Sequence, residues 1–316
     1  MPLSLRRHGS ISLLAAASVL LLGCDPGPGT LPCSSGADCA SGECMANGVC
    51  APQQDAGSGD GGTPLRDASR PDSGPPVADA GSGLCRPDGD DAISRAEAPF
   101  GPGLEVRYRA ALDVGINTAG ADLGDGRRRW DFGAALPGER DLDLATEALD
   151  GRWYADRFVG ADYAARLSSN NDLLGVFRVT ESALELLGVV SPEEGITRTE
   201  LTYAPAVRVL VFPLEEGTSW TSDTRVTGVA QGLAANYGER YESRVDARGE
   251  VVTPFAPFEA LRVATTLTRD LTFSQTTVHT LTWVAPCFGS VVTATSEEDE
   301  SDPEFDRAQE IRRLGF

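Results

Sequence analysis

Apolar and polar residues alternate along several stretches of the chain after residue 100. The segment LEVRYRAAL, residues 104–112, has apolar residues at its even positions and charged residues between the first four of them. The segment YGERYESRVDA, residues 237–247, places Tyr241 and Val245 on one face and charged residues on the other. Strict alternation is typical of a strand with one buried face. Both segments are therefore predicted to be strands.

Further stretches of strand-like composition follow the same pattern. They are residues 206–212, 220–229, 261–267, 276–284 and 289–295. Turn-forming clusters, such as SPEEG from residue 191 and DARGE from residue 246, separate these stretches without a helix between them. Strands joined in this way pair antiparallel. Residues 85–316 are therefore predicted to form one mainly β domain around an antiparallel sheet.

One short helix is predicted at the C-terminus, over residues 303–314. Asp302 is a good N-cap residue, Pro303 suits the first helical position, and acidic residues follow in the first turn. Arginines occupy the expected last turn, and Gly315 comes directly after it. These are the usual start and stop signals of a helix.

The N-terminus has the layout of a secretory signal peptide over residues 1–23. Arg6 and Arg7 give a positive start, residues 11–22 give an apolar run, and Gly23 is a small residue at the cleavage position. The apolar run is shorter than the ~20 residues of a membrane-spanning helix. The sequence therefore predicts an exported chain.

The four residues Leu21-Leu22-Gly23-Cys24 resemble the lipobox of bacterial lipoproteins. The resemblance implies that Cys24 becomes the first residue after cleavage and carries acyl chains such as palmitate. Leu22 is larger than the residue usual at that place. The alternative for Cys24 is an ordinary cysteine of the signal region, lost on cleavage or free. The alternative for the export route is a twin-arginine signal at Arg6-Arg7, although RRHGSIS lacks the apolar residues expected after the pair.

Four cysteines lie close together after the anchor, within residues 33–50. They are Cys33, Cys39, Cys44 and Cys50. So short a segment has almost no apolar residues to bury, so a fixed shape requires cross-links, and in an exported chain two disulfides are expected. A zinc site is the competing interpretation, but the gaps match the close C-x2-4-C pairs of structural zinc sites poorly.

Residues 51–84 are dominated by Gly, Pro, Asp, Ala and Ser, and their only large aliphatic residues are Leu65, Val77 and Leu84. Such a composition cannot offset the entropy of ordering the chain. The expected plan is a signal peptide (1–23), a lipidated tether (24–32), a Cys-rich mini-module (33–50), a disordered linker (51–84) and the β-rich domain (85–316).

Cys85 and Cys287 remain once the other cysteines are assigned. One is the first residue of the β-rich domain, and the other lies in APCFG between two predicted late strands. Because chain ends often meet at a domain surface, the two are predicted to form a disulfide. The alternatives are two reduced thiols or a cross-link of Cys85 to the mini-module.

Acidic residues far outnumber basic ones in this chain. Without the two arginines of the signal, 25 basic residues face 47 acidic ones, and all the basic residues are arginine. This excess disfavours nucleic acid as a partner, since phosphates require basic patches. The acidic run at residues 296–306 is interpreted as a solvated loop, with cation binding as the alternative.

The segment RPDGDDAISRAE, residues 86–97, resembles an EF-hand or dockerin-like calcium loop. Its third, fifth, ninth and twelfth positions hold Asp88, Asp90, Ser94 and Glu97. The first position is Arg86 in place of Asp, and the sixth is Asp91 in place of glycine. The segment is thus predicted to be a degenerate loop, with a weak calcium site as the alternative and no other cofactor expected.

Enzymatic motifs are absent from the sequence. After removal of the signal, His279 is the only histidine, and no G-x-S-x-G, H-E-x-x-H or P-loop pattern occurs. His279 lies in TVHTLTW, a predicted strand, where a packed histidine is expected rather than a catalytic one. The chain is therefore predicted not to be an enzyme.

The stretches FPLEEGTSW, TPFAPFEALRV and TWVAPCFGSVV resemble segments of lipoproteins of unknown function whose sheet curls into a half-barrel. The whole layout is similar to that of myxobacterial lipoproteins. The resemblance implies a curved half-barrel or a sandwich in the cell envelope, with the outer membrane or cell surface expected rather than the inner membrane. A displayed module that meets a protein, glycan or lipid partner is favoured. The alternative is a carrier of a lipid or other apolar ligand within the curved sheet.

Overall fold

The computed structural model describes residues 85–316, apart from residue 272. Within them lie fourteen strands and two short 3₁₀ helices. The helices are η2 (Arg95–Glu97) and η3 (Ala155–Arg157). The first strands are β1 (Glu105–Gly115), β2 (Ala121–Asp122), β3 (Arg128–Asp131), β4 (Arg140–Glu147), β5 (Tyr163–Arg166), β6 (Leu174–Val179) and β7 (Ala183–Val190). The others are β8 (Glu200–Val211), β9 (Ser219–Ala230), β10 (Leu233–Val252), β11 (Pro257–Asp270), β12 (Gln275–Ala285), β13 (Gly289–Thr295) and β14 (Arg307–Leu314).

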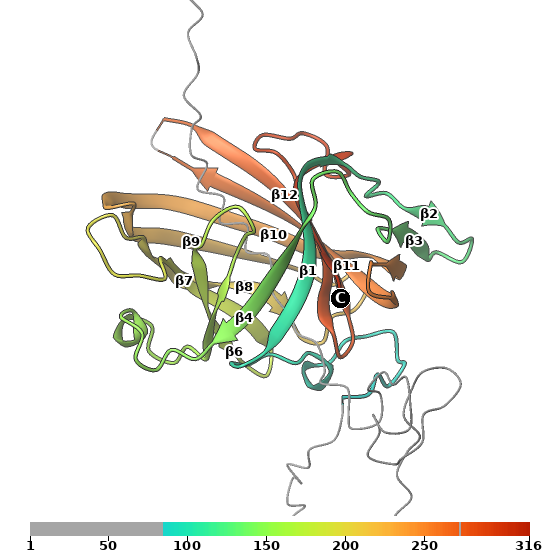
Figure 1. Cartoon of the computed structure of the whole chain (residues 1–316), viewed down its shortest axis with the longest axis horizontal. Coiled ribbons are helices and arrows are strands. Elements are labelled where there is room, and N and C mark those ends of the chain that lie inside the picture. Colours follow the sequence, from blue (N-terminus) through green and yellow to red (C-terminus); the bar gives the residue numbers. More distant parts are fainter. Residues whose placement is uncertain (1–84, 272) are drawn as a thin grey trace, which may run out of the picture. The chain divides into compact units, whose positions relative to one another are not determined.

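Twelve of these strands, β1 and β4 to β14, form a closed antiparallel barrel (Figure 1). Each strand pairs with the next along the chain from β4 to β14, and β1 closes the ring between β14 and β4. Ala110 of β1 lies opposite Arg312 on one side and opposite Arg140 on the other. The expectation of a mainly β, antiparallel domain is confirmed. The half-barrel or sandwich is wrong, because β1 and β14 leave no open edge in the ring.

The predicted C-terminal helix at residues 303–314 is also wrong, because β14 occupies most of it. The backbone of β14 finds strand partners on both sides, with Ile311 opposite Ala294 of β13 and opposite Ala111 of β1. Two sheet edges thus supply the hydrogen bonds that a helix would have to supply itself. The capping residues Asp302 and Pro303 lie in the loop before the strand, where the Asp302 side chain accepts a bond from the Glu304 amide.

The strands predicted from alternation are all present, as β1 and β8 to β13. The turn predicted at DARGE is wrong, since β10 runs on to Val252 and has only a bulge between Val245 and Ala247. A bulge bends a strand without ending it. The longer β10 therefore pairs with β9 along its first half and with β3 along its last residues.

Two connections pack against the outside of the barrel. The segment between β1 and β4 carries β2 and β3, and its Trp130 and Phe132 make edge contacts with Trp283 of β12, at ring-centroid distances of 5.6 and 5.0 Å. The segment between β4 and β5 places Tyr154 and Phe158 in a separate apolar cluster over β6 and β7. No helix in residues 85–316, with residue 272 left aside, is long and apolar enough to span a bilayer.

Candidate functional site

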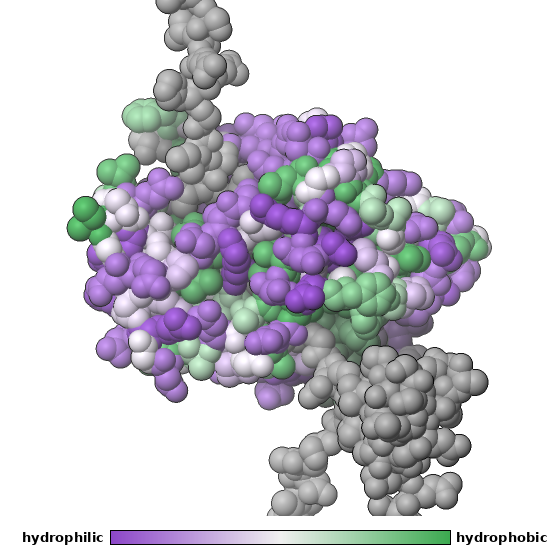
Figure 2. Space-filling view, viewed as in Figure 1, coloured by the Kyte–Doolittle hydropathy of each residue, from purple (hydrophilic) through white to green (hydrophobic). Residues whose placement is uncertain are grey.

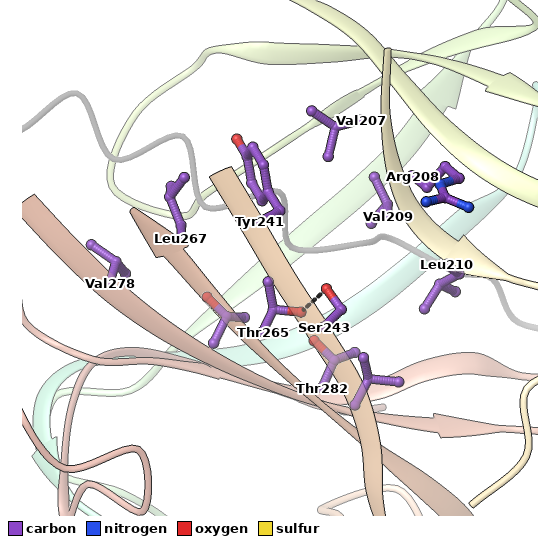
Figure 3. Close-up of a pocket in the computed structure, with 12 residues that line it drawn as sticks. Val207, Arg208, Val209, Leu210, Tyr241, Ser243, Thr265, Leu267, Val278 and Thr282 are labelled. Carbon is purple, nitrogen blue, oxygen red and sulfur yellow. Dashed lines mark hydrogen bonds between the residues drawn. The ribbon is translucent and has the colours of Figure 1, made fainter. Parts of the chain in front are cut away.

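The interior of the barrel, here called the lumen, is lined by hydroxyl groups on one side. Ser243, Thr265, Thr280, Thr295 and Glu310 lie directly opposite one another on β10 to β14. Directly opposed residues point to the same face of a sheet. Figure 3 shows Ser243 and Thr265 joined by a hydrogen bond of 2.9 Å and facing the valines of β8.

The cavity described inside the lumen is small. Between this hydroxyl row and Val207 and Val209 of β8 lies a cavity of about 30 Å³ (Figure 3). One water molecule needs about 10–15 Å³ of such space, and pockets for drug-sized ligands span roughly 300–1,000 Å³. The cavity therefore has room for a few waters and no room for an acyl chain.

Two buried carboxylates in the lumen are fully engaged by protein groups. Glu239 lies opposite Arg269, with 2.8 Å between Oε1 and Nε, and its Oε2 accepts a bond of 2.6 Å from the Tyr241 hydroxyl. Glu310 accepts bonds from the Ser168 hydroxyl at 2.6 Å and the Ser169 amide at 2.9 Å. Burial, followed by the charge of Glu239, raises the pKa of Tyr237 to about 12. These groups serve the fold, since each acceptor already has its donor.

His279 is held by structural contacts. Its Nδ1 lies 3.1 Å from the Thr266 hydroxyl, and its Nε2 lies 3.1 Å from the carbonyl oxygen of Glu300. A neutral ring satisfies both contacts when Nε2 donates to the carbonyl and Nδ1 accepts from the hydroxyl. The acidic run at 296–306 is thus packed in part onto the barrel, and its Glu304 forms an ion pair with Arg262 at 2.5 Å.

The predicted disulfide between Cys85 and Cys287 is confirmed, with a Cα–Cα distance of 5.5 Å. It joins the segment before β1 to the turn between β12 and β13. Beside it, the Cys287 amide donates a bond of 2.6 Å to the Glu97 carbonyl oxygen. Cys24 and the four cysteines Cys33, Cys39, Cys44 and Cys50 lie outside the described residues.

The four residues of the calcium-loop candidate lie in one loop, but their oxygens face the loop's own donors. The Asp88 carboxylate accepts a bond from the Asp90 amide at 3.1 Å, and the Asp90 carboxylate accepts one from the Ala92 amide at 2.9 Å. Glu97 accepts bonds from the amides of Asp88 and Ser94 at 3.0 and 2.9 Å. Burial alone would raise the pKa of Glu97, but these hydrogen bonds outweigh it and lower that pKa. Within the part of the chain that the structure describes, no three acidic, His or Cys side chains are grouped to hold a metal ion.

We therefore predict that calcium has little effect on stability. With a dissociation constant of 1 mM or weaker, 1 mM calcium would stabilise the native state by at most about 0.4 kcal/mol, which is about 1 °C in melting temperature for a domain of this size. Calorimetry of the full chain in chelator and in millimolar calcium measures this difference. A rise of many degrees in calcium, lost in an Asp90→Asn variant, would contradict the prediction.

The outer surface has a much larger hollow, the end groove, with a volume of about 680 Å³. One wall is the segment 87–97, and the opposite wall is the start of β11 with the turn after β12. The disulfide ties these two walls together, because Cys85 precedes the first and Cys287 lies in the second. Ile93 fixes the first wall by exchanging two backbone hydrogen bonds of 2.9 Å with Leu214.

Phenylalanines line and border the end groove. Phe258 and Phe288 face each other edge-on at 4.8 Å inside it, and Phe255 and Phe316 extend the cluster at centroid distances of 6.3 and 5.6 Å. Phe255 and Phe316 are exposed to solvent. Figure 2 shows a hydrophobic patch over this C-terminal end of the chain, on a face that is otherwise mostly hydrophilic. Exposed apolar patches of this kind mark interaction sites.

Four of the five charged residues that line the end groove form ion pairs, and the fifth, Glu97, is bound by amides of its own loop. Arg127 forms an ion pair with Glu259, and Arg248 forms one with Asp91 at 2.5 Å. No excess charge is therefore offered to an ionic ligand by these four side chains. The groove is a hollow with an aromatic wall, and its charged lining consists of three carboxylates and two guanidiniums.

The end groove was not predicted from the sequence. Its parts are Asp91 and Glu97 of the calcium-loop candidate, Pro257 and Phe258 of TPFAPFEALRV, and Phe288 next to Cys287. The available signal was the predicted disulfide, which already required residues near 85 and 287 to meet. Comparison with protein-family models, with curated proteins and with solved structures finds no match for this chain.

Proposed function

We propose that this protein is a lipid-anchored protein of the cell envelope that displays its barrel as a non-enzymatic binding module. Export and anchoring are supported by the signal at residues 1–23 and the lipobox-like sequence ending in Cys24. The expected location is the outer membrane or the cell surface. The display role is supported by one observation: the cavity described in the lumen measures about 30 Å³, while a hollow of about 680 Å³ lies on the outer surface.

The same observation distinguishes display from carriage. A carrier of lipid within the sheet requires an apolar lumen large enough for the ligand. The cavity of about 30 Å³ is too small, and the lumen also contains hydroxyls and two buried carboxylates. An alkyl chain placed against such groups would gain little binding free energy, because the hydrophobic effect depends on apolar surface on both the ligand and the site.

A binding role also fits the chemistry of the side chains. His279 is held by Thr266 and Glu300, so it is not placed to activate a nucleophile. The domain is acidic, which disfavours nucleic acid. Protein, glycan and lipid partners remain the classes to consider, in addition to the membrane that holds the anchor.

Anchoring is tested by a Cys24→Ala change in the native host. The variant has no cysteine at position 24 to carry acyl chains, and stable attachment to a membrane needs more than one chain. It is therefore expected to appear in the soluble envelope fraction, or to remain as the uncleaved precursor. Thr30→Ala, a neighbouring change outside the lipobox, should partition like the wild type. Normal cleavage of Cys24→Ala with unchanged membrane partitioning would refute the anchor.

A further inference from the structure

The start of β11 has one strand edge without a partner. Residues 257–260 pair with Gly249–Val252 of β10 on one side. On the other side, pairing with β12 begins only at Leu261, which lies opposite Val284, because β12 ends and turns away at Ala285. Successive residues of a strand turn their N–H and C=O groups to opposite edges, and Phe258 and Ala260 face β10, so the second edge offers the N–H and C=O of Glu259 and the C=O of Pro257.

This free edge opens into the end groove. Successive residues of a strand point to opposite faces, so a hollow that touches only one face would meet alternate residues. The end groove is lined by Phe258, Glu259, Ala260 and Leu261 in succession. It therefore reaches around the edge of the strand, where the unpaired N–H and C=O groups point.

The exposed edge requires hydrogen-bond partners, and the groove requires apolar ones. Unpaired edge strands are templates for pairing with another chain. An extended peptide satisfies both needs, since its backbone pairs with the edge and every second side chain enters an adjoining pocket. Phe258 and Phe288 provide an apolar surface for such a side chain. Two of the three carboxylates in the groove are paired with arginines, so the lining gives only a weak preference for a charged partner.

We propose that the end groove binds an extended polypeptide segment of a partner protein, which adds as a strand to residues 257–260 of β11 and packs an aromatic or aliphatic side chain against the joined rings of Phe258 and Phe288. The proposal rests on the binding role proposed above and names its partner class. A glycan or a lipid would leave the backbone edge without a matching ladder of donors and acceptors.

The test begins with a phage-displayed library of random decapeptides, selected on the purified full chain in detergent. Enriched sequences are expected to alternate apolar and polar residues. Their binding should fall about tenfold or more in Phe258→Ala and in Phe288→Ala, because truncated anchor side chains at an interface have effects of this size. The matched control is Phe273→Ala, a phenylalanine that is 98% exposed in the turn at the other end of β11, and it should bind like the wild type.

Backbone pairing is tested separately from apolar contact. A selected peptide that is N-methylated at alternate amides keeps its side chains but loses donors, and we expect one of the two alternate patterns to abolish binding. Hydrogen exchange of the Glu259 amide, which points to the free edge, should slow when the unmodified peptide binds, while the amides of Phe258 and Ala260, which face β10, should change less.

Three results would overturn the proposal: no enrichment over the Phe258→Ala chain, equal binding of both N-methylated forms, or native mass spectrometry that finds a lipid or glycan bound in the groove. Circular dichroism of each variant establishes that it is folded. Failure here leaves the anchoring result with Cys24→Ala untouched, so the two proposals fail separately.

Discussion

Removal of the disulfide with Cys85→Ser and Cys287→Ser is expected to lower the free energy of unfolding by up to about 5 kcal/mol. The bond links residues 202 apart, and closing so long a loop restricts the unfolded chain strongly in the entropy model. Residual structure in the unfolded chain reduces this figure. The barrel itself should persist, because its ladder from β1 to β14 does not depend on the bond.

Chemical denaturation of the wild type and the double variant measures the loss as a lower midpoint. Reductant alone is a poorer test, since it also reaches the cysteines of residues 33–50. The variant should in addition expose the first wall of the end groove, seen as faster hydrogen exchange at residues 86–92, while Ile93 remains paired with Leu214. An unchanged midpoint together with unchanged exchange would show that backbone contacts alone fix this wall.

The strands could be predicted because a half-buried strand leaves its period in the sequence. Residues 104–112 and 237–247 alternate in the sequence, and both form strands. Burial alternates through 237–247, but in β1 the alternation stops at Ala110, because Ala111 is also buried and Leu112 is exposed. The closure of the ring could not be predicted, because it depends on β1 meeting β14 across almost the whole domain. No local pattern encodes so distant a pairing. The disulfide was predictable only because cysteines can be counted and assigned by elimination.

β14 shows why a local signal can mislead. Its inner face holds Glu310 and Arg312, and its outer face holds Ile311 and Arg313, so alternation of apolar and polar residues is lost. Arg313 is buried because its guanidinium donates to the carbonyl of Phe132 at 2.6 Å, in the connection that covers the barrel. From the sequence alone, Arg312 and Arg313 were interpreted as the last turn of a helix. The strands that pair with β14 are not visible in this local pattern.

The buried position of Glu239 was not predicted either, because the residue that pairs with it is 30 positions away in the sequence. It lies on the apolar face of the predicted strand, between Tyr237 and Tyr241, and its partner Arg269 is on the next strand. Glu239 has none of its side chain exposed, and Arg269 has 9% exposed. Burial by itself lowers the pKa of Arg269, but the adjacent carboxylate outweighs burial and raises it. The guanidinium of Arg269 therefore keeps its charge inside the barrel.

We predict that Arg269→Met is among the most destabilising single changes in the lumen. It leaves the Glu239 carboxylate buried with only the Tyr241 hydroxyl as a donor, and breaking a buried pair in this way costs about 3–5 kcal/mol. The double change Glu239→Leu with Arg269→Met should recover most of that loss, because two apolar residues replace two charges that both needed solvation. Urea unfolding of both variants measures the difference.

The matched control is Arg240, which follows Glu239 on β10 and lies on the outer face of that strand. Arg240 pairs with Asp223 at 2.9 Å, but the two side chains are 47% and 66% exposed. Exposed ion pairs contribute about 0–1 kcal/mol, so Arg240→Met should change the free energy of unfolding by less than about 1 kcal/mol. Equal costs for Arg269→Met and Arg240→Met would mean that water reaches Glu239. The lumen would then be hydrated, with more open space than its cavity of about 30 Å³ provides.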